Sequence, residues 1–211
     1  MIKAISFDLD GTLVYHKKEY IVEVVGKTLL ELGFQPDEKF SYEFWYGSNR
    51  SKIIQEKLGI EPMRFWKIFW EYDKPEMRIK NTEVYEDVLA LKSIYDRGIK
   101  LGIVTGALSN VAKLEISKIN EKVKGIKFDS VITNKPGMKP KPYPDPLLES
   151  LKELGVEKEE LIYVGNGMED VEAAKKAGIF PVIVLREENK WMNFDISVKL
   201  INSLYELEKM L

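Results

Sequence analysis

Two aspartates near the N-terminus have a spacing that suits a metal site. Asp8 and Asp10 follow the short apolar run 2–7, and Gly11 comes directly after them. Residues two apart in an extended strand point to the same side, so we expect the two carboxylates to act together. Carboxylate oxygens are the ligands that a hard cation such as Mg²⁺ prefers. A polar strand end followed by a glycine turn would give the same pattern without any function.

Two further groups of polar residues could bind an anion. Thr105 and Gly106 end another apolar run and offer a hydroxyl and backbone amides to an anionic oxygen, although threonine also caps helices. Lys139 and Lys141 lie among prolines, where a rigid loop could hold an ammonium over a phosphate. Without further context, a solvated basic loop is the better explanation for these lysines.

A fourth polar group follows the apolar run 161–165. Asn166 comes directly after this run, and Glu169 and Asp170 fall in the first turn of the helix predicted next. The helix dipole favours acids in that position, which is a purely structural explanation. Asp170 could equally face a cation.

The elements that must position these groups alternate between strand and helix. Strands are predicted at 2–7, 99–105, 128–133, 161–165 and 180–185, and helices at 84–97, 107–119, 146–154 and 170–177. Such alternation, with nearly continuous apolar strands, predicts an α/β fold with a doubly wound parallel Rossmann-like sheet. Ligands bind such sheets at the carboxyl ends of the strands, which is where all four polar groups fall.

The stretch 15–81 breaks the alternation. It shows no convincing strand, is rich in aromatic residues, and has helical patterns at 20–32, 40–46, 48–58 and 64–72. We therefore expect an inserted all-helical domain at 15–81, with the Rossmann-like catalytic core formed by 1–14 and 82–211. Within the insertion, Asn49 and Arg50 could meet a substrate, although surface residues are the commoner explanation. His16, the only histidine, lies near the expected hinge.

Composition narrows the possible functions. The 211 residues carry a net charge of -2, which gives no strong attraction to nucleic acid or an anionic membrane. The absence of cysteine excludes disulfides, thiolate metal sites and cysteine nucleophiles. No membrane span or signal peptide is predicted, so we expect a cytoplasmic protein. Glutamine is rare while lysine and glutamate are abundant, which is a thermophile-like bias.

In their order along the chain, these segments resemble the haloacid dehalogenase (HAD) superfamily, in its phosphatase branch with a helical cap after the first strand. The resemblance rests on the run 8–13 (DLDGTL), on Thr105, on 141–146 (KPYPDP) and on 164–178 (VGNGMEDVEAAKKAG). It covers the whole chain, because the helical insertion lies where members of the superfamily carry their cap. Each segment alone is weakly specific, whereas the combination is highly specific.

The resemblance implies a Mg²⁺-dependent phosphatase that hydrolyses a small phosphate ester through an aspartyl-phosphate, with a cap that closes over the substrate. It makes Asp8 the nucleophile and Asp10 the general acid and base, with Thr105, Gly106 and Lys141 binding the phosphoryl group. Lys141 is preferred to Lys139 because it begins the matching segment. The implied metal ligands are Asp8, the Asp10 backbone carbonyl, Asn166 and Asp170.

One residue departs from the superfamily's pattern and keeps different functions open. Asn166 stands where the superfamily usually has an aspartate, so one negative charge is missing and we expect weaker metal binding. A 2-haloacid dehalogenase resembles the chain at Asn166 but typically lacks the acid at Asp10. A phosphomutase and a non-catalytic binding protein on the same fold are also compatible with the pattern. The sequence names neither the phosphate ester nor the oligomeric state, which is expected to be a monomer or a homodimer.

Overall fold

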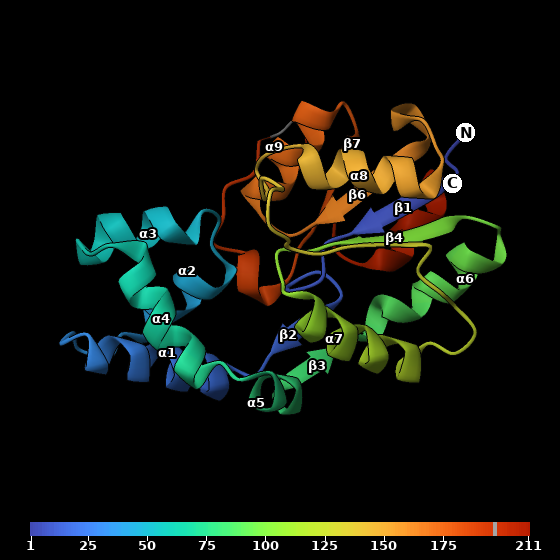
Figure 1. Ribbon diagram of the computed structural model, residues 1–211. Helices are drawn as coiled ribbons and strands as arrows, with labels where there is room; N and C mark the ends of the chain where they lie inside the picture. The colour runs from blue at the N-terminus through green and yellow to red at the C-terminus, as the bar shows by residue number, and fades with distance from the viewer. Residues whose placement is uncertain (196–197) are drawn as a thin grey trace. The chain divides into compact units, whose positions relative to one another are not determined.

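The chain forms two compact units in a computed structural model that describes residues 1–195 and 198–211 (Figure 1). The first, which we call the core unit, comprises Met1–Tyr15 and Val84–Leu211, and the second, the helical unit, comprises His16–Glu83. The predicted cap boundaries at 15 and 81 stay a prediction, because compactness alone does not say what the helical unit does.

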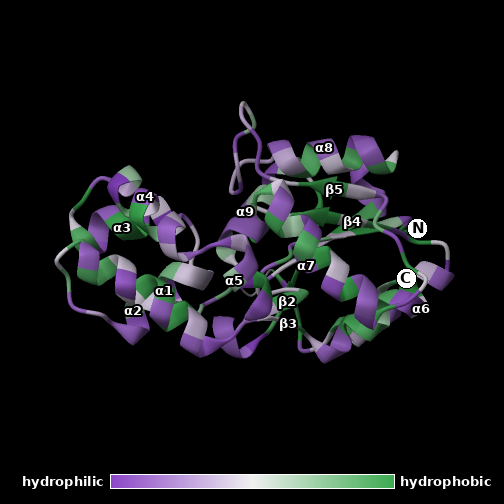
Figure 2. Ribbon diagram, turned by 60° about the horizontal axis from the view of Figure 1, so that its bottom comes forward, coloured by the Kyte–Doolittle hydropathy of each residue, from purple (hydrophilic) through white to green (hydrophobic). Residues whose placement is uncertain are grey.

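The core unit is built on one six-stranded parallel sheet. Its strands are β1 (Ala4–Phe7), β4 (Lys100–Val104), β5 (Ser130–Ile132), β6 (Leu161–Gly165), β7 (Phe180–Val184) and β8 (Lys199–Ile201), in the order β5-β4-β1-β6-β7-β8. Figure 2 shows β4 and β5 as largely hydrophobic segments inside this unit. The predicted α/β, Rossmann-like fold is therefore confirmed.

Helices cover both faces of this sheet (Figure 1). They are α6 (Ala90–Asp96), α7 (Ser109–Lys122), α8 (Asp145–Leu154) and α9 (Met168–Ala177). On one face, Ile5 and Phe7 of β1 join a buried cluster with side chains of α6 and α7. On the other, Ala4 of β1 and Tyr163 of β6 pack with α8 and α9. Successive residues of β1 thus serve opposite faces, and Asp8 continues on from this strand.

The helical unit is held together by aromatic side chains. Its helices are α1 (Lys18–Glu31), α2 (Glu38–Tyr46), α3 (Arg50–Leu58), α4 (Pro62–Tyr72) and α5 (Pro75–Lys80). Phe44 of α2 lies 4.8 Å from the ring of Phe65 and 5.5 Å from that of Phe69, both in α4. These tilted and edge-on contacts bury large rings against one another, as expected for aromatics at helical spacing.

The shortest elements differ from the prediction. Strands β2 (Val14–His16) and β3 (Thr82–Val84) pair with each other where the chain passes between the units. The prediction of no strand within 15–81 is therefore wrong at residues 15–16. Strand β8 and helix α5 were also missed, and the helix predicted at 84–97 is a 3₁₀ turn (Glu86–Leu89) followed by α6. Segments of three residues are too short for periodicity to reveal.

No helix in residues 1–195 or 198–211 is both long enough and apolar enough to cross a membrane.

Candidate active site

The strand register brings three of the predicted polar groups to one edge of the sheet. Phe7, the last residue of β1, is level with Ile103 in β4 and Val164 in β6. Asp8 continues from β1, and its backbone N–H donates to the Val164 carbonyl at 2.8 Å. Because the strands are parallel, the residues just beyond them, Thr105 and Asn166, follow at the same carboxyl edge.

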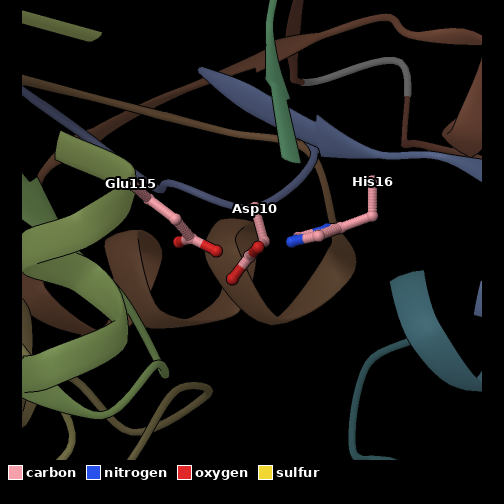
Figure 3. A group of neighbouring side chains, drawn as sticks. All are labelled: Asp10, His16 and Glu115. Atoms are coloured by element: carbon pink, nitrogen blue, oxygen red, sulfur yellow. The ribbon is translucent and has the colours of Figure 1, made fainter. Parts of the chain in front are cut away.

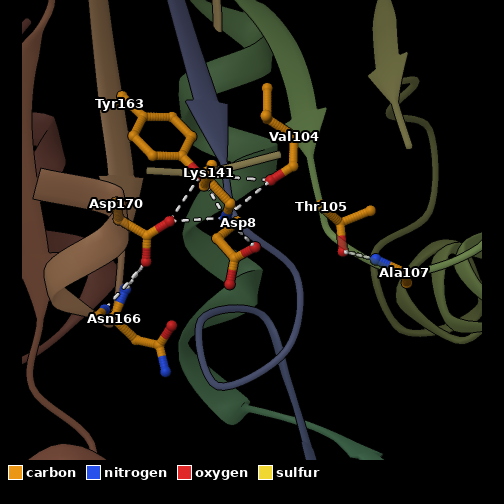
Figure 4. Close-up of polar contacts among 9 residues, drawn as sticks. Asp8, Val104, Thr105, Ala107, Lys141, Tyr163, Asn166 and Asp170 are labelled. Atoms are coloured by element: carbon orange, nitrogen blue, oxygen red, sulfur yellow. Dashed lines mark hydrogen bonds and ion pairs between the residues drawn. The ribbon is translucent and has the colours of Figure 1, made fainter. Parts of the chain in front are cut away.

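Lys141 joins two acids at this edge (Figure 4). Its Nζ donates to Asp8 Oδ1 and to Asp170 Oδ1, each at 2.7 Å. Only 6 % of the Lys141 side chain is exposed, with 10 % of Asp8 and 3 % of Asp170. The proline-rich loop 136–146 therefore places a buried ammonium between two buried carboxylates. Lys139 is exposed and lies 5.1 Å over the Tyr143 ring, away from this cluster of charges.

Both oxygens of Asp170 accept hydrogen bonds from the protein. Oδ2 accepts the backbone N–H groups of Asn166 at 3.1 Å and Gly167 at 3.0 Å, while Oδ1 accepts Lys141 and the Tyr163 hydroxyl. A carboxylate offers about four acceptor positions, so this set of donors holds Asp170 firmly in place. Gly165 makes room for it, since a Cβ there would lie only 2.3 Å from Asp170 Cγ.

Burial and charge together perturb this cluster. Burial raises the pKa of Asp8 to about 8, although the Lys141 ammonium opposes this, and the charge of Asp170 adds to the rise. Burial alone would lower the pKa of Lys141, but Asp170 and Asp8 outweigh it and hold that pKa well above its ordinary value. Two carboxylates, Asp8 and Asp170, face the single positive charge of Lys141. When both are ionised, the cluster is negative and favours an additional cation.

Asp10 has a different neighbour from Asp8. Strand β1 ends at Phe7, so the expected alternation does not carry through to Asp10. A carboxylate oxygen of Asp10 lies within 4.8 Å of one from Glu115, a fully buried residue of α7. Figure 3 shows these two carboxyl groups, which come from the turn after β1 and from α7. The two aspartates of the first motif thus meet different partners.

Thr105 and Asn166 complete the sheet edge. Thr105 is 5 % exposed, and its Oγ1 accepts the Ala107 N–H at 3.1 Å, which leaves the hydroxyl hydrogen to donate elsewhere. An added Cβ at Gly106 would meet no atom within 4 Å, so its backbone is open to an approaching group. The Asn166 side chain extends away from Asp170 (Figure 4).

A short segment after β7 ties two of the site's loops together. The Asn189 amide donates to the Asn166 carbonyl at 2.9 Å, and Arg186 Nη2 donates to the Thr12 carbonyl at 2.7 Å. Arg186 is itself fixed by both carboxylate oxygens of Asp87, at 2.8 and 2.9 Å. The loops that follow β1 and β6 are therefore anchored to one buried polar cluster.

Sequence reasoning missed two residues beside the site. Tyr163 was taken as part of an apolar strand, although its hydroxyl contacts Lys141 and Asp170. Glu115 shares the buried face of α7 with Ala112 and Ile119. An acid on the apolar side of a predicted helix is the sequence feature that could have revealed Glu115. For Tyr163 the only signal was a hydroxyl in an otherwise apolar strand.

The remaining candidates lie in the helical unit and have structural partners there. Asn49 caps the N-terminus of α3 in a left-handed conformation (φ 53°), and its side chain accepts the Lys52 N–H. The Arg50 guanidinium lies 5.3 Å over the Trp66 ring. Trp45 Nε1 donates to His16 Nδ1 at 3.2 Å, which assigns the hydrogen of a neutral His16 ring to Nε2. These contacts explain Asn49, Arg50 and His16 structurally and give none of them a role in substrate binding.

Comparison with known proteins gives a consistent set of relatives. The family model for haloacid dehalogenase-like hydrolases matches residues 5–184. The phosphoglycolate phosphatase of Aquifex aeolicus is 32 % identical over 195 residues, covering 87 % of this chain and 85 % of that protein. The glyceraldehyde 3-phosphate phosphatase of Methanocaldococcus jannaschii is 28 % identical over 226 residues, covering 98 % of this chain and 96 % of that protein. A crystal structure from Lactobacillus plantarum shares the fold over all of both chains, with a TM-score of 0.82 at 18 % identity.

The raised pKa of Asp8 predicts how stability changes with pH. Because this pKa rises from 3.8 to about 8, the folded protein binds more protons than the unfolded chain between these values. The free energy of unfolding of the metal-free protein should therefore fall as the pH rises through this range. Asp8→Asn removes this contribution. From about pH 5 to about pH 8, the free energy of unfolding of the variant should therefore rise by a few kcal/mol relative to that of the wild type, at roughly 1.4 kcal/mol per pKa unit.

The measurement is denaturant unfolding in the presence of a chelator. Asp96→Asn, at an exposed aspartate of α6, is the matched control and should follow the wild type at every pH. Parallel pH profiles for the wild type and Asp8→Asn would show that Asp8 is not the perturbed group.

Proposed function

This chain belongs to the haloacid dehalogenase-like hydrolase family, and we propose that it is a Mg²⁺-dependent phosphatase that acts through an aspartyl-phosphate on Asp8. One observation carries the proposal, namely that Lys141 Nζ lies 2.7 Å from both Asp8 and Asp170 at the carboxyl edge of the sheet. An ammonium beside a carboxylate offsets the repulsion between that carboxylate and an incoming phosphate.

The donor set around Asp8 fits Mg²⁺. We assign metal binding to the Asp8 carboxylate, the Asp10 backbone carbonyl and the Asn166 side-chain oxygen, all of which are hard oxygen ligands. Burial raises the pKa of Asp8 and the charge of Asp170 adds to this rise, so a cation at this place would favour the ionised carboxylate. Asp170, predicted as a fourth ligand, already accepts four hydrogen bonds, so we give it the role of holding Lys141 and the loop at Asn166. When bound, Mg²⁺ supplies positive charge to the phosphoryl oxygens.

In the first step, an Asp8 oxygen attacks phosphorus while the bond from phosphorus to the leaving oxygen breaks. The Asp10 carboxyl gives its proton to that leaving oxygen. Lys141 donates a hydrogen bond to the phosphoryl group, as do the Thr105 hydroxyl and the backbone around Gly106. The products of this step are the free alcohol and a phosphorylated Asp8.

In the second step, the Asp10 carboxylate takes a proton from water, and the water oxygen attacks phosphorus. The bond between phosphorus and Asp8 breaks, which releases phosphate and regenerates the Asp8 carboxylate. Asp10 thereby regains the proton that it gave away. This proton cycle is the reason to prefer a phosphatase over a dehalogenase, which has no use for an acid at position 10.

The substrate is proposed to be a small phosphate ester. Two relatives are named for phosphoglycolate and for glyceraldehyde 3-phosphate, which are small and carry one phosphate. The helical unit is our candidate for the cap, and we assign substrate selection to it.

We predict that the protein hydrolyses an aryl phosphate in the presence of Mg²⁺ and loses this activity when a chelator removes the metal. Asp8→Asn should lower the rate by at least about 1,000-fold, because an amide cannot act as the nucleophile. Release of inorganic phosphate measures both effects. 2-Phosphoglycolate and glyceraldehyde 3-phosphate complete the panel, together with a 2-haloacid to test for a dehalogenase and a sugar phosphate to test for a mutase.

Normal turnover by Asp8→Asn would show that Asp8 is not the nucleophile. Halide release without phosphate release would replace the phosphatase by a dehalogenase. A folded protein that neither binds Mg²⁺ nor cleaves any ester would favour a non-catalytic binding protein.

Asn166 generates a second prediction, about metal affinity. Asn166→Asp adds a charge at a proposed ligand, so the Mg²⁺ concentration for half-maximal activity should fall by about tenfold or more. Asn202→Asp adds the same charge at an exposed residue after β8, two strands from β6, and should leave the metal response unchanged. Titration calorimetry with Mg²⁺ gives a readout that does not depend on turnover. Equal affinities in the wild type and Asn166→Asp would show that residue 166 is not a ligand.

A further inference from the structure

Tyr163 is a buried tyrosine whose hydroxyl reaches the charged cluster. It lies in β6 with no exposed surface, and its ring packs in the cluster between the sheet and helices α8 and α9. The other residues of this strand, Leu161, Ile162, Val164 and Gly165, are apolar. A phenylalanine would satisfy the packing, so the hydroxyl group needs a separate explanation.

The hydroxyl acts as donor and acceptor at once (Figure 4). It accepts a hydrogen from Lys141 Nζ at 3.0 Å and donates its own to Asp170 Oδ1 at 2.9 Å. The Val104 carbonyl is a more distant acceptor at 3.3 Å, and the charged carboxylate is also the stronger one. Burial and the charge of Asp170 hold the pKa of Tyr163 well above its ordinary value, which keeps the phenol protonated and able to donate.

The hydroxyl also completes the coordination of Lys141. An ammonium has three hydrogens to donate. Two go to Asp8 and Asp170 at 2.7 Å, and the Tyr163 oxygen at 3.0 Å takes the third. The Val104 carbonyl lies further from Nζ, at 3.4 Å, and competes weakly for that hydrogen. Tyr163 is therefore the neutral partner that fixes the direction of the ammonium.

We propose that Tyr163 is a positioning residue that, with Asp170, holds the Lys141 ammonium beside Asp8 during phosphoryl transfer. The kinetic part of this inference rests on the proposed phosphatase function. When Asp8 becomes phosphorylated, its oxygen no longer offers a full negative charge to Lys141. Tyr163 and Asp170 remain unchanged in that state, so they keep the ammonium in place next to the phosphoryl oxygens.

Tyr163→Phe tests the proposal, because it removes the hydroxyl and keeps the ring. We expect kcat to fall by about tenfold to a hundredfold, as for the loss of a hydrogen bond to a charged group, with KM changed by less than about twofold. Tyr85→Phe is the matched control. It removes another core-unit hydroxyl that donates to a carboxylate, Glu188 at 2.8 Å, and should leave kcat unchanged.

A second readout follows Lys141 itself and needs no activity. In the metal-free wild type, the Lys141 ammonium should give a ¹H–¹⁵N signal protected from exchange with water, and loss of this signal in Lys141→Arg identifies it. Tyr163→Phe should accelerate its exchange and shift it, whereas Tyr85→Phe should not. This measurement stays informative if no ester is cleaved, so failure of the phosphatase function and failure of the Tyr163 inference are distinguishable.

Each outcome decides the inference. The absence of a protected ammonium signal in the wild type overturns it, even if Tyr163→Phe proves too unstable to study. An unchanged Lys141 signal in Tyr163→Phe overturns it whatever the kinetic result, because the hydroxyl would then act elsewhere. A changed signal with unchanged kcat overturns the kinetic part. A changed signal with the expected fall in kcat supports it.

Discussion

The buried ion pairing of Lys141 with Asp8 and Asp170 is the interaction on which the rest of the site depends. Removing Lys141 would leave buried carboxylates without a counter-charge, and breaking a buried ion pair in this way typically costs about 3–5 kcal/mol. The three residues come from a loop, a strand end and the start of a helix, so their pairing requires these elements to converge. The parallel sheet supplies this convergence, since β1 and β6 are neighbours and end at the same edge.

The pairing is also unbalanced, which connects the structure to the proposed chemistry. Two carboxylates face one ammonium, and burial raises the pKa of Asp8 to about 8. A phosphate ester is itself an anion and would be repelled by the surplus charge. A metal ion bound at Asp8, as proposed, would resolve both difficulties, because it would stabilise the ionised carboxylate and attract the phosphate. Asn166 contributes no charge to this balance, so the strength of the proposed metal binding is the property in which this chain should differ from the superfamily's usual pattern.

Much of this arrangement could be predicted from the sequence, because it follows from strands with clear hydrophobic patterns. The runs containing Ile5, Ile103 and Val164 are buried and apolar, and the polar residues that follow them meet at one edge as expected. The partner of Asp10 could not be predicted, because the strand stops at Phe7 and the turn after it sets a new direction. Tyr163 and Glu115 could not be recognised for a different reason. Both occupy positions where an apolar residue would also fit, and the polar groups they approach, Lys141 for Tyr163 and Asp10 for Glu115, lie far away in the sequence.

Trapping a covalent bond between Asp8 and phosphorus is the sharpest test of the proposed phosphatase mechanism. Asp10→Asn should still transfer phosphate from an aryl phosphate, whose leaving group needs no proton, but it lacks the base that activates water for the second step. Acid quenching of this variant with Mg²⁺ and substrate, followed by proteolysis and mass spectrometry, should find a phosphate on Asp8. Hydroxylamine should remove it, as expected for an acyl phosphate. Release of the aryl alcohol by the wild type, with no phosphate on Asp8 in either protein or with phosphate on another residue, would contradict the account.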